Sequence, residues 1–160
     1  MKIKSFSRFI QVICFIFMVT SFCNAQSCDP LNSAQLKEKL IQLGNTVKDL
    51  TTTPGSEKYE VKFTTPTFDV PVGFEISPST NFVWLTVFLG APRADTSVMN
   101  AALLKQNGAI QPCQFYITAK GNLMMGLAVE NRGLTNAILK RHSDKIVADV
   151  ASTASFWQQK

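Results

Sequence analysis

The spacing of hydrophobic residues changes along the chain, and each spacing predicts a different element. The first set recurs at intervals of four and three residues: Leu36, Leu40, Leu43, Val47 and Leu50. This spacing is typical of one apolar face of an amphipathic helix. Gly44 lies within the stripe and, as a poor helix former, can end the helix early. Pro54-Gly55 then predicts a turn.

Three strand-like runs follow this turn. Residues 59–63 and 68–76 alternate between apolar and polar side chains, so each predicts a strand with one buried and one solvated face. Pro71 has no N–H to donate, which favours an edge or bulged position for the second strand. Residues 82–89 barely alternate, and this run predicts a central strand that is apolar on both faces.

The second half of the chain predicts two helices around a hairpin. A helix starts after Thr96 or Ser97 and stops at Asn107-Gly108. Residues 114–118 and 123–129 form the hairpin, and residues 134–157 form a long closing helix. The element order is therefore α-β-β-β-α-β-β-α. Hairpin connections favour a largely antiparallel five-stranded sheet with helices packed on it, which is an α+β fold.

The N-terminus has the layout of a secretory signal peptide. Lys2, Lys4 and Arg8 precede an apolar run over residues 9–22, and small residues follow up to Ala25. The run is short for a membrane span, although an uncleaved anchor or a lipoprotein remains an alternative. We expect residues 1–25 to be a signal peptide cleaved after Ala25, 26–33 a lead-in and 34–158 a single α+β domain. The mature protein would then be periplasmic or secreted, without a stable membrane span.

Cleavage changes what charge and cysteine content imply. The chain has 16 basic and 11 acidic residues; the leader carries three of the basic ones, so 13 remain against 11, a net charge of +2. This small charge, without a basic cluster, predicts no nucleic-acid binding. Of four cysteines, Cys28 and Cys113 remain. In an oxidising compartment we expect them to form a disulfide, with two independent buried thiols as the alternative.

Residues that carry catalysis are sparse. His142 is the only histidine, and its neighbours Ser143 and Asp144 lie beside it on a predicted helix rather than converging from separate elements. Cys28 and Cys113 lack zinc-ligand spacing, and no phosphate-binding glycine motif is present. We therefore predict no catalytic residues, no metal site and no cofactor. An enzyme or small-molecule binder with an unrecognised site remains an alternative.

The order of elements and the apolar spacing over residues 99–157 resemble those of a known fold. This segment comprises a helix ending Ala-Leu-Leu-Lys-Gln-Asn-Gly, strands Gln-Phe-Tyr-Ile-Thr and Leu-Met-Met-Gly-Leu-Ala-Val, and the closing helix. This pattern resembles the type III secretion chaperone-like superfamily, which includes class I secretion chaperones and YbjN-like proteins. The resemblance implies a non-catalytic protein that usually dimerises. It also implies that an extended partner segment is held against apolar surface patches.

The strand at residues 82–89 is the main functional signal. Its two faces carry alternate residues, namely Phe82, Trp84, Thr86 and Phe88 on one, and Val83, Leu85, Val87 and Leu89 on the other. Helices should cover one face and leave the other exposed, unless loops or the middle helix cover both. Exposed apolar patches mark interfaces.

The candidate interface residues, from this strand and the middle helix, are Phe82, Trp84, Phe88, Val98, Met99 and Leu103. We interpret the chain as an exported non-enzymatic binding protein for a protein or peptide partner. A homodimer is one expected assembly, and a structural envelope component is a further alternative.

Overall fold

The computed structural model describes residues 29–91 and 97–158. The expected signal peptide and Cys28 lie outside these ranges. The helices are α1 Ser33–Gln42, α2 Ser97–Gln106, α3 Asn136–Ser152 and α4 Ala154–Trp157. The strands are β1 Val47–Thr51, β2 Lys58–Thr64, β3 Asp69–Ile76, β4 Phe82–Gly90, β5 Gln114–Ile117 and β6 Leu123–Glu130.

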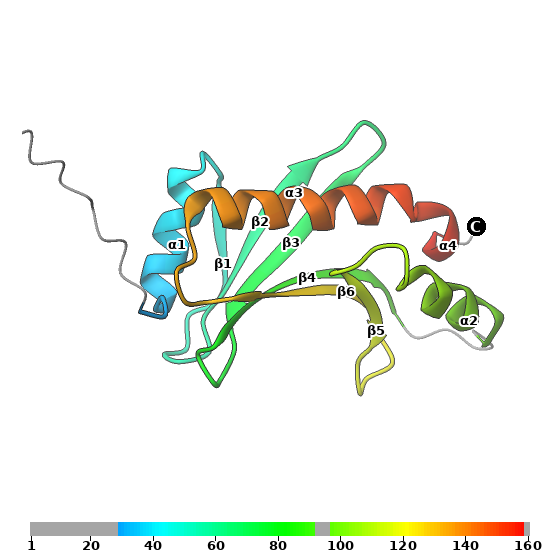
Figure 1. Ribbon diagram of the computed structural model, residues 1–160, viewed down its shortest axis with the longest axis horizontal. Helices are drawn as coiled ribbons and strands as arrows, with labels where there is room; N and C mark the ends of the chain where they lie inside the picture. Colours follow the sequence, from blue (N-terminus) through cyan, green and yellow to red (C-terminus); the bar gives the residue numbers. More distant parts are fainter. Residues whose placement is uncertain (1–28, 92–96, 159–160) are drawn as a thin grey trace, which may run out of the picture.

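The strands form one six-stranded sheet in the order β1-β2-β3-β4-β6-β5, and all neighbouring pairs are antiparallel. The connection from β4 to β6 passes through α2 and β5, so β5 lies at the sheet edge. Helix α3 crosses one side of the sheet, with α1 at one end of the molecule and α2 at the other (Figure 1). The predicted α+β fold is confirmed, with one strand more than expected.

The additional strand comes from the stripe that predicted a helix as far as Leu50. Helix α1 begins with a capping box between Asn32 and Gln35 and ends at Gln42. Gly44 then adopts a φ of +82°, a conformation that glycine reaches without steric cost. The chain turns there, and Val47 pairs with Val61 of β2. The helix thus ends early, as Gly44 allows, and the stripe does not continue it to Leu50, because Val47–Thr51 gains backbone partners in the sheet.

One face of the sheet and the helices α1 and α3 enclose the core. Strand β4 contributes Val83, Leu85 and Val87, which are at most 2% exposed. Their neighbours from the helices include Leu36 and Leu139, which are fully buried. The helices thus cover the odd-numbered face of β4, and its even-numbered face points away from them.

The closing helix is interrupted rather than continuous to Trp157. Thr135 caps the start of α3 by accepting a hydrogen bond from the N–H of Ile138 (3.0 Å). At the other end the Thr153 hydroxyl donates to the carbonyl of Asp149 (2.6 Å), and the helix ends there. The short α4 then brings the indole N–H of Trp157 to the carbonyl of Val150 (3.2 Å).

Pro71 predicts an edge or bulged position for the second strand, β3. The structure has an unpaired edge only at the start of this strand. Strand β3 lies between β2 and β4, yet its pairing with β4 covers only Gly73 to Ile76. Pro71 precedes this segment and is paired only with Lys62 of β2. The missing N–H is therefore tolerated where β3 has a single neighbour.

Within residues 29–91 and 97–158, no helix is long and apolar enough to cross a bilayer.

Candidate functional site: the open face of the sheet

The sheet face opposite α1 and α3 divides into a polar half and an apolar half. Across β1, β2 and β3 it carries three ion pairs between strands: Lys48–Glu60, Lys58–Glu75 and Lys62–Asp69. Their side chains are partly exposed, as expected for a solvated surface. This half therefore offers no reason to expect a further layer of protein.

The other half, over β4, β6 and β5, is aromatic and apolar. In the sheet register Phe88 lies opposite Met124, and Met124 lies opposite Tyr116. Two rows along on the same face, beyond Thr86 and Gly126, Trp84 lies between Glu75 on β3 and Ala128 on β6. Directly opposed residues share a face. We call Trp84, Phe88, Tyr116 and Met124 the open-face patch.

Glycine at position 126 shapes a hollow in this patch. A Cβ atom at Gly126 would lie 2.8 Å from Cε1 of Tyr116, so the tyrosine ring sits against bare backbone. The hollow, of about 360 Å³, is lined by Glu75, Trp84, Thr86, Gln114 and Tyr116. Burial raises the pKa of Tyr116, and the negative charge of Glu75 adds to the effect. The hollow thus combines two aromatic rings with one carboxylate.

The candidate interface residues fall into two groups in the structure. Phe82 (43% exposed) and Phe88 (55%) join the half-buried Trp84 on the open face, as the alternation of β4 predicts. On α2, Val98 is 84% exposed and Met99 is half-buried.

Leu103 is 2% exposed, so its assignment to a surface is wrong: it packs in the core. Its neighbour Leu104 is 68% exposed instead. Two consecutive leucines signal that one must face away, but the helix pattern does not say which.

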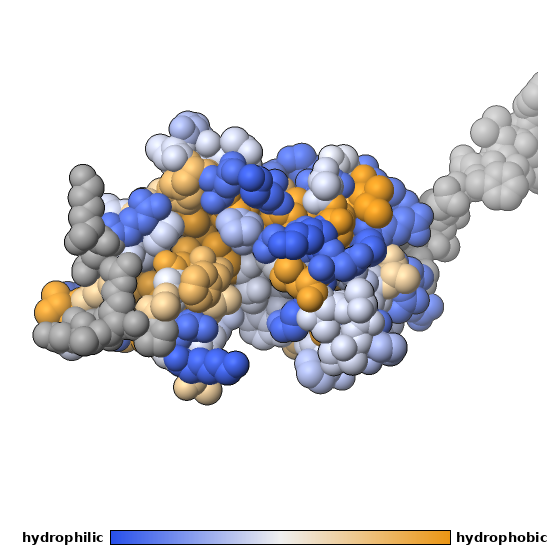
Figure 2. All heavy atoms as spheres, turned by 180° about the vertical axis from the view of Figure 1, so that it is seen from behind, coloured by the Kyte–Doolittle hydropathy of each residue, from blue (hydrophilic) through white to orange (hydrophobic). Residues whose placement is uncertain are grey.

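Helix α2 and β5 enclose a second apolar hollow. Its volume is about 310 Å³, and Leu103, Leu104, Phe115, Ile117 and Leu123 are among its lining residues. In the view from behind, hydrophobic side chains gather near the end of the molecule that carries α2 (Figure 2). The exposed Val98, Leu104, Ile117 and Phe88 all belong to α2 or to strands of the apolar half. This end of the molecule therefore carries much apolar surface.

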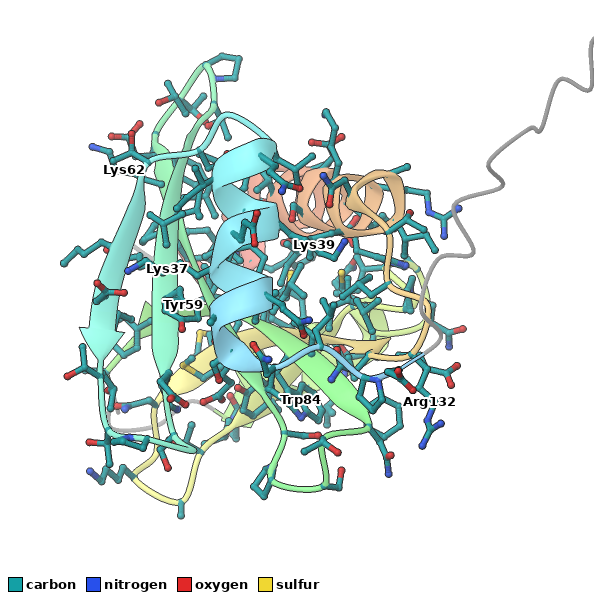
Figure 3. All side chains as sticks on the ribbon, turned by 90° about the vertical axis from the view of Figure 1, so that its left-hand side faces the viewer. Lys37, Lys39, Tyr59, Lys62, Trp84 and Arg132 are labelled. Atoms are coloured by element: carbon teal, nitrogen blue, oxygen red, sulfur yellow. The ribbon has the colours of Figure 1, made fainter. Side chains whose placement is uncertain are left out.

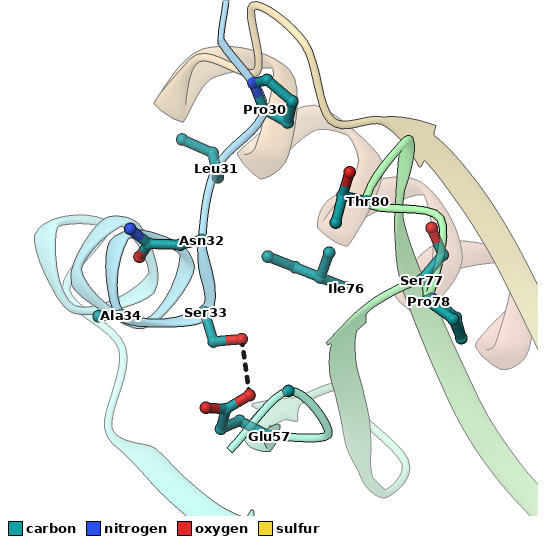
Figure 4. A pocket seen from close by; sticks show the side chains of 11 residues that line it. Pro30, Leu31, Asn32, Ser33, Ala34, Glu57, Ile76, Ser77, Pro78 and Thr80 are labelled. Atoms are coloured by element: carbon teal, nitrogen blue, oxygen red, sulfur yellow. Dashed lines mark hydrogen bonds between the residues drawn. The ribbon is translucent and has the colours of Figure 1, made fainter.

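A hollow of about 740 Å³, larger than the two above, lies between the start of α1, the β1–β2 loop and the β3–β4 turn (Figure 4). Its polar contact is a hydrogen bond from the Ser33 hydroxyl to Glu57 (3.0 Å). Backbone hydrogen bonding and the Ser33 hydroxyl lower the pKa of Glu57, so this carboxylate is ionised at neutral pH.

A smaller hollow of about 310 Å³ adjoins the hollow at the start of α1 and the open-face hollow. It shares Glu57 and Pro78 with the hollow at the start of α1, and Glu75 and Trp84 with the open-face hollow. We call this run of three hollows the groove. In Figure 3 the label of Trp84 lies just below α1.

Other reactive groups are not assembled into a site. Cys113 has no disulfide partner among the described residues and is 1% exposed, and burial together with the neighbouring Asp149 carboxylate raises its pKa to about 12. His142 lies on α3, and burial and Arg141 lower its pKa. Within the described part of the chain, no three acidic, histidine or cysteine residues are placed to hold a metal ion. Cys28 lies outside that part, so its pairing with Cys113 stays a prediction.

The fold has a distant likeness among solved structures. No family model and no curated protein matches the sequence. The fold is similar to a chain in the structure of the heterodimeric complex ExoU–SpcU from the type III secretion system of Pseudomonas aeruginosa. The match has a TM-score of 0.47 and 14% identity, and it covers 76% of this chain and 96% of that one. At this distance the likeness carries no functional argument.

Proposed function

We propose that this chain is an exported, non-enzymatic binding protein that holds an extended protein segment on the open face of its sheet. The observation that carries the proposal is the open-face patch itself. Three strands of this face carry ion pairs, whereas the next three carry exposed or half-exposed aromatic and methionine side chains. Apolar patches of this kind on a soluble domain mark interaction sites.

The shape of the surface supports an extended ligand. The groove runs from the start of α1 past the β3–β4 turn to Trp84, and continues over the sheet towards Tyr116. A peptide strand places alternate side chains on one side, so a run of connected hollows can accept them in sequence. Aromatic residues such as Trp84 and Tyr116 are enriched among residues that dominate binding energy.

A displayed library of unstructured peptides, selected on the mature domain, tests this function. Peptides selected on the native protein are then measured against Phe88→Glu and against Ile41→Glu. Ile41 is a matched control, because it is 53% exposed but lies on α1. A buried phenylalanine is worth about 1.5–3 kcal/mol. We therefore expect Phe88→Glu to weaken binding roughly ten- to hundredfold.

Circular dichroism of both variants establishes that they remain folded. If no peptide is selected, or if the selected peptides bind Phe88→Glu as tightly as the native domain, the open face is not the binding surface. Peptides that respond to Ile41→Glu instead would move the site to α1.

Export is part of the same proposal and rests on the N-terminal sequence. Expression of the full chain in a host with a secretory pathway should give a mature protein that begins at Gln26. Intact-mass measurement of the exported fraction reads the cleavage site directly. Retention of residues 1–25 on a membrane-bound product would favour the uncleaved anchor.

A further inference from the structure

The open-face hollow has features that a purely apolar peptide would not need. Glu75 stands beside Trp84 in the register of β3 and β4, and its charge reaches Tyr116 on β5. Two aromatic rings and a carboxylate therefore line one hollow of about 360 Å³. Aromatic faces attract cations because their π electrons are negative, and a carboxylate adds a direct charge.

The adjoining part of the groove is also acidic. Glu57, Lys58 and Glu75 line the hollow that continues from Trp84 towards the start of α1. Lys58 forms an ion pair with Oε2 of Glu75. Glu57 is ionised, and among the described residues it accepts from Ser33 rather than forming an ion pair. Two carboxylates against one ammonium leave a negative charge here, although the expected mature chain carries +2.

We propose that the groove receives a basic side chain, best an arginine, of the bound segment, with its cationic head between Trp84 and Tyr116 and beside Glu75. This inference rests on the proposed function and names the chemistry of its partner. A guanidinium fits better than an ammonium, because its planar face stacks on aromatic rings while the N–H groups along its edge donate several hydrogen bonds. Gln114 and Thr86 supply further side-chain oxygens in the same hollow.

A pair of capped tripeptides that differ only in charge tests the inference. Acetyl-Thr-Arg-Thr-amide carries the guanidinium, and the citrulline version is its neutral isostere. Binding is followed by NMR through the indole N–H of Trp84, assigned with a Trp84→Phe variant. The indole of Trp157 is an internal control, because it lies at α4 and packs edge-on against Phe68.

We expect the arginine peptide to move the Trp84 signal, and the citrulline peptide to bind at least threefold more weakly. Glu75→Gln should remove most of this preference, and added salt should reduce it. The matched control is Glu60→Gln: Glu60 lies on the same sheet face in a similar pair with Lys48, but it does not line the hollow. This control should leave the preference unchanged.

Equal binding of the two peptides, or no response at Trp84 to millimolar peptide, overturns the inference. So does a loss of preference in Glu60→Gln equal to that in Glu75→Gln, because the effect would then be one of general surface charge. These outcomes are separate from failure of the proposed function. Peptides whose binding depends on Phe88 but that contain no basic residue would support the open-face binding site and contradict only the proposal of a bound basic side chain.

Discussion

Asn131 is a fully buried amide that ties together three segments of the chain. Its side chain accepts from the N–H of Leu31 (3.1 Å) and donates to the carbonyls of Leu31 (3.0 Å) and Thr80 (2.8 Å). The partners lie 100 and 51 residues away in the sequence. These bonds hold the start of the domain and the β3–β4 turn on either side of the hollow at the start of α1.

Asn131→Ala should destabilise the domain by about 2–4 kcal/mol, because it leaves buried backbone groups without partners. Urea unfolding of the mature protein measures the change. Asn136→Ala is the control, since Asn136 is bonded only near the surface, to Lys39 and Gln42, and should cost about 0.5 kcal/mol or less. Equal losses of stability in the two variants would mean that the buried hydrogen bonds of Asn131 contribute no more than surface ones.

Cys113 couples stability to alkaline pH. Its pKa is about 12 in the fold, against an ordinary value of 9.0, chiefly because it is buried and also because it neighbours Asp149. Above pH 9 the unfolded chain loses the thiol proton while the folded chain keeps it. The stabilising contribution is therefore complete below about pH 9 and is lost as pH rises towards 12.

We expect the free energy of unfolding of the native protein to fall more steeply above pH 9 than that of Cys113→Ala. Comparing the slopes isolates the thiol from the tyrosines and lysines that also titrate. The same burial should make Cys113 slow to react with iodoacetamide until the protein is unfolded. Parallel slopes in the two proteins would contradict the assignment.

At the scale of elements, the outer edge of strand β5 forms hydrogen bonds with a side chain rather than with another strand. Asn107, just after α2, accepts from the N–H of Phe115 (2.7 Å) and donates to its carbonyl (3.2 Å). These are the groups that a neighbouring strand would otherwise use. An open edge invites pairing with other chains. The bonds also fix β5, and with it Tyr116, against α2.

Asn107→Ala should lower stability by about 1–3 kcal/mol and expose one donor and one acceptor at the edge. Thermal unfolding measures the loss, and light scattering on heating reports any increase in aggregation. Gln106→Ala, one residue earlier and at the end of α2, is the control for helix effects. A variant as stable as the control would show that solvent satisfies Phe115 equally well.

The strands show which elements the local hydrophobic pattern can predict and which it cannot. Alternation correctly predicts β2 and β3, because a half-buried strand needs one apolar face wherever it lies, and a continuous apolar run predicts β4. Helical spacing fails at Val47–Thr51, where two residues of the stripe instead enter the sheet after Gly44. The strand exists because β2 supplies its hydrogen-bond partners, and β2 lies beyond the following turn.

For the whole molecule, the exposed apolar surface of α2 predicts self-association. Helix α2 is apolar around much of its circumference, yet among its described residues only Leu103 is buried. Helices of this kind are normally covered. We therefore expect the mature protein to be a homodimer that uses Val98 and Leu104.

Light scattering over a concentration series measures the oligomeric state of the mature protein. Leu104→Glu should give a monomer, whereas Ile41→Glu, which changes an exposed residue on α1, should remain a dimer. A native protein that is monomeric at every concentration would contradict the dimer. It would leave α2 available to a separate partner.

At the same scale, the places of Pro30 and Cys113 in the fold bear on the predicted disulfide. Pro30 forms a bridge with Arg132, before α3 begins, whereas Cys113 neighbours Asp149 near its end. The rise of α3 from Asn136 to Asp149 is about 20 Å. The two-residue step from Pro30 back to Cys28 spans at most about 7 Å.

The Cys28–Cys113 disulfide stays a prediction, and this distance favours its alternative, two separate thiols. Thiol titration of unreduced, unfolded mature protein should find two groups per chain. A count of zero, with the mass of a monomer, would establish the intramolecular disulfide. It would also require the N-terminal segment to leave Arg132.

By itself the sequence determined the class of fold, most of the elements and the two-faced character of β4. These properties are local, because periodicity reports how each segment divides its side chains between core and solvent. Only the tertiary structure decided which face of β4 the helices cover, which of Leu103 and Leu104 is buried, and that Asn131 clamps the first turn of the domain. It also brought Glu75, Trp84 and Tyr116 into one hollow. Such contacts join residues far apart in the sequence, and they follow from how helices and strands pack rather than from any pattern within one of them.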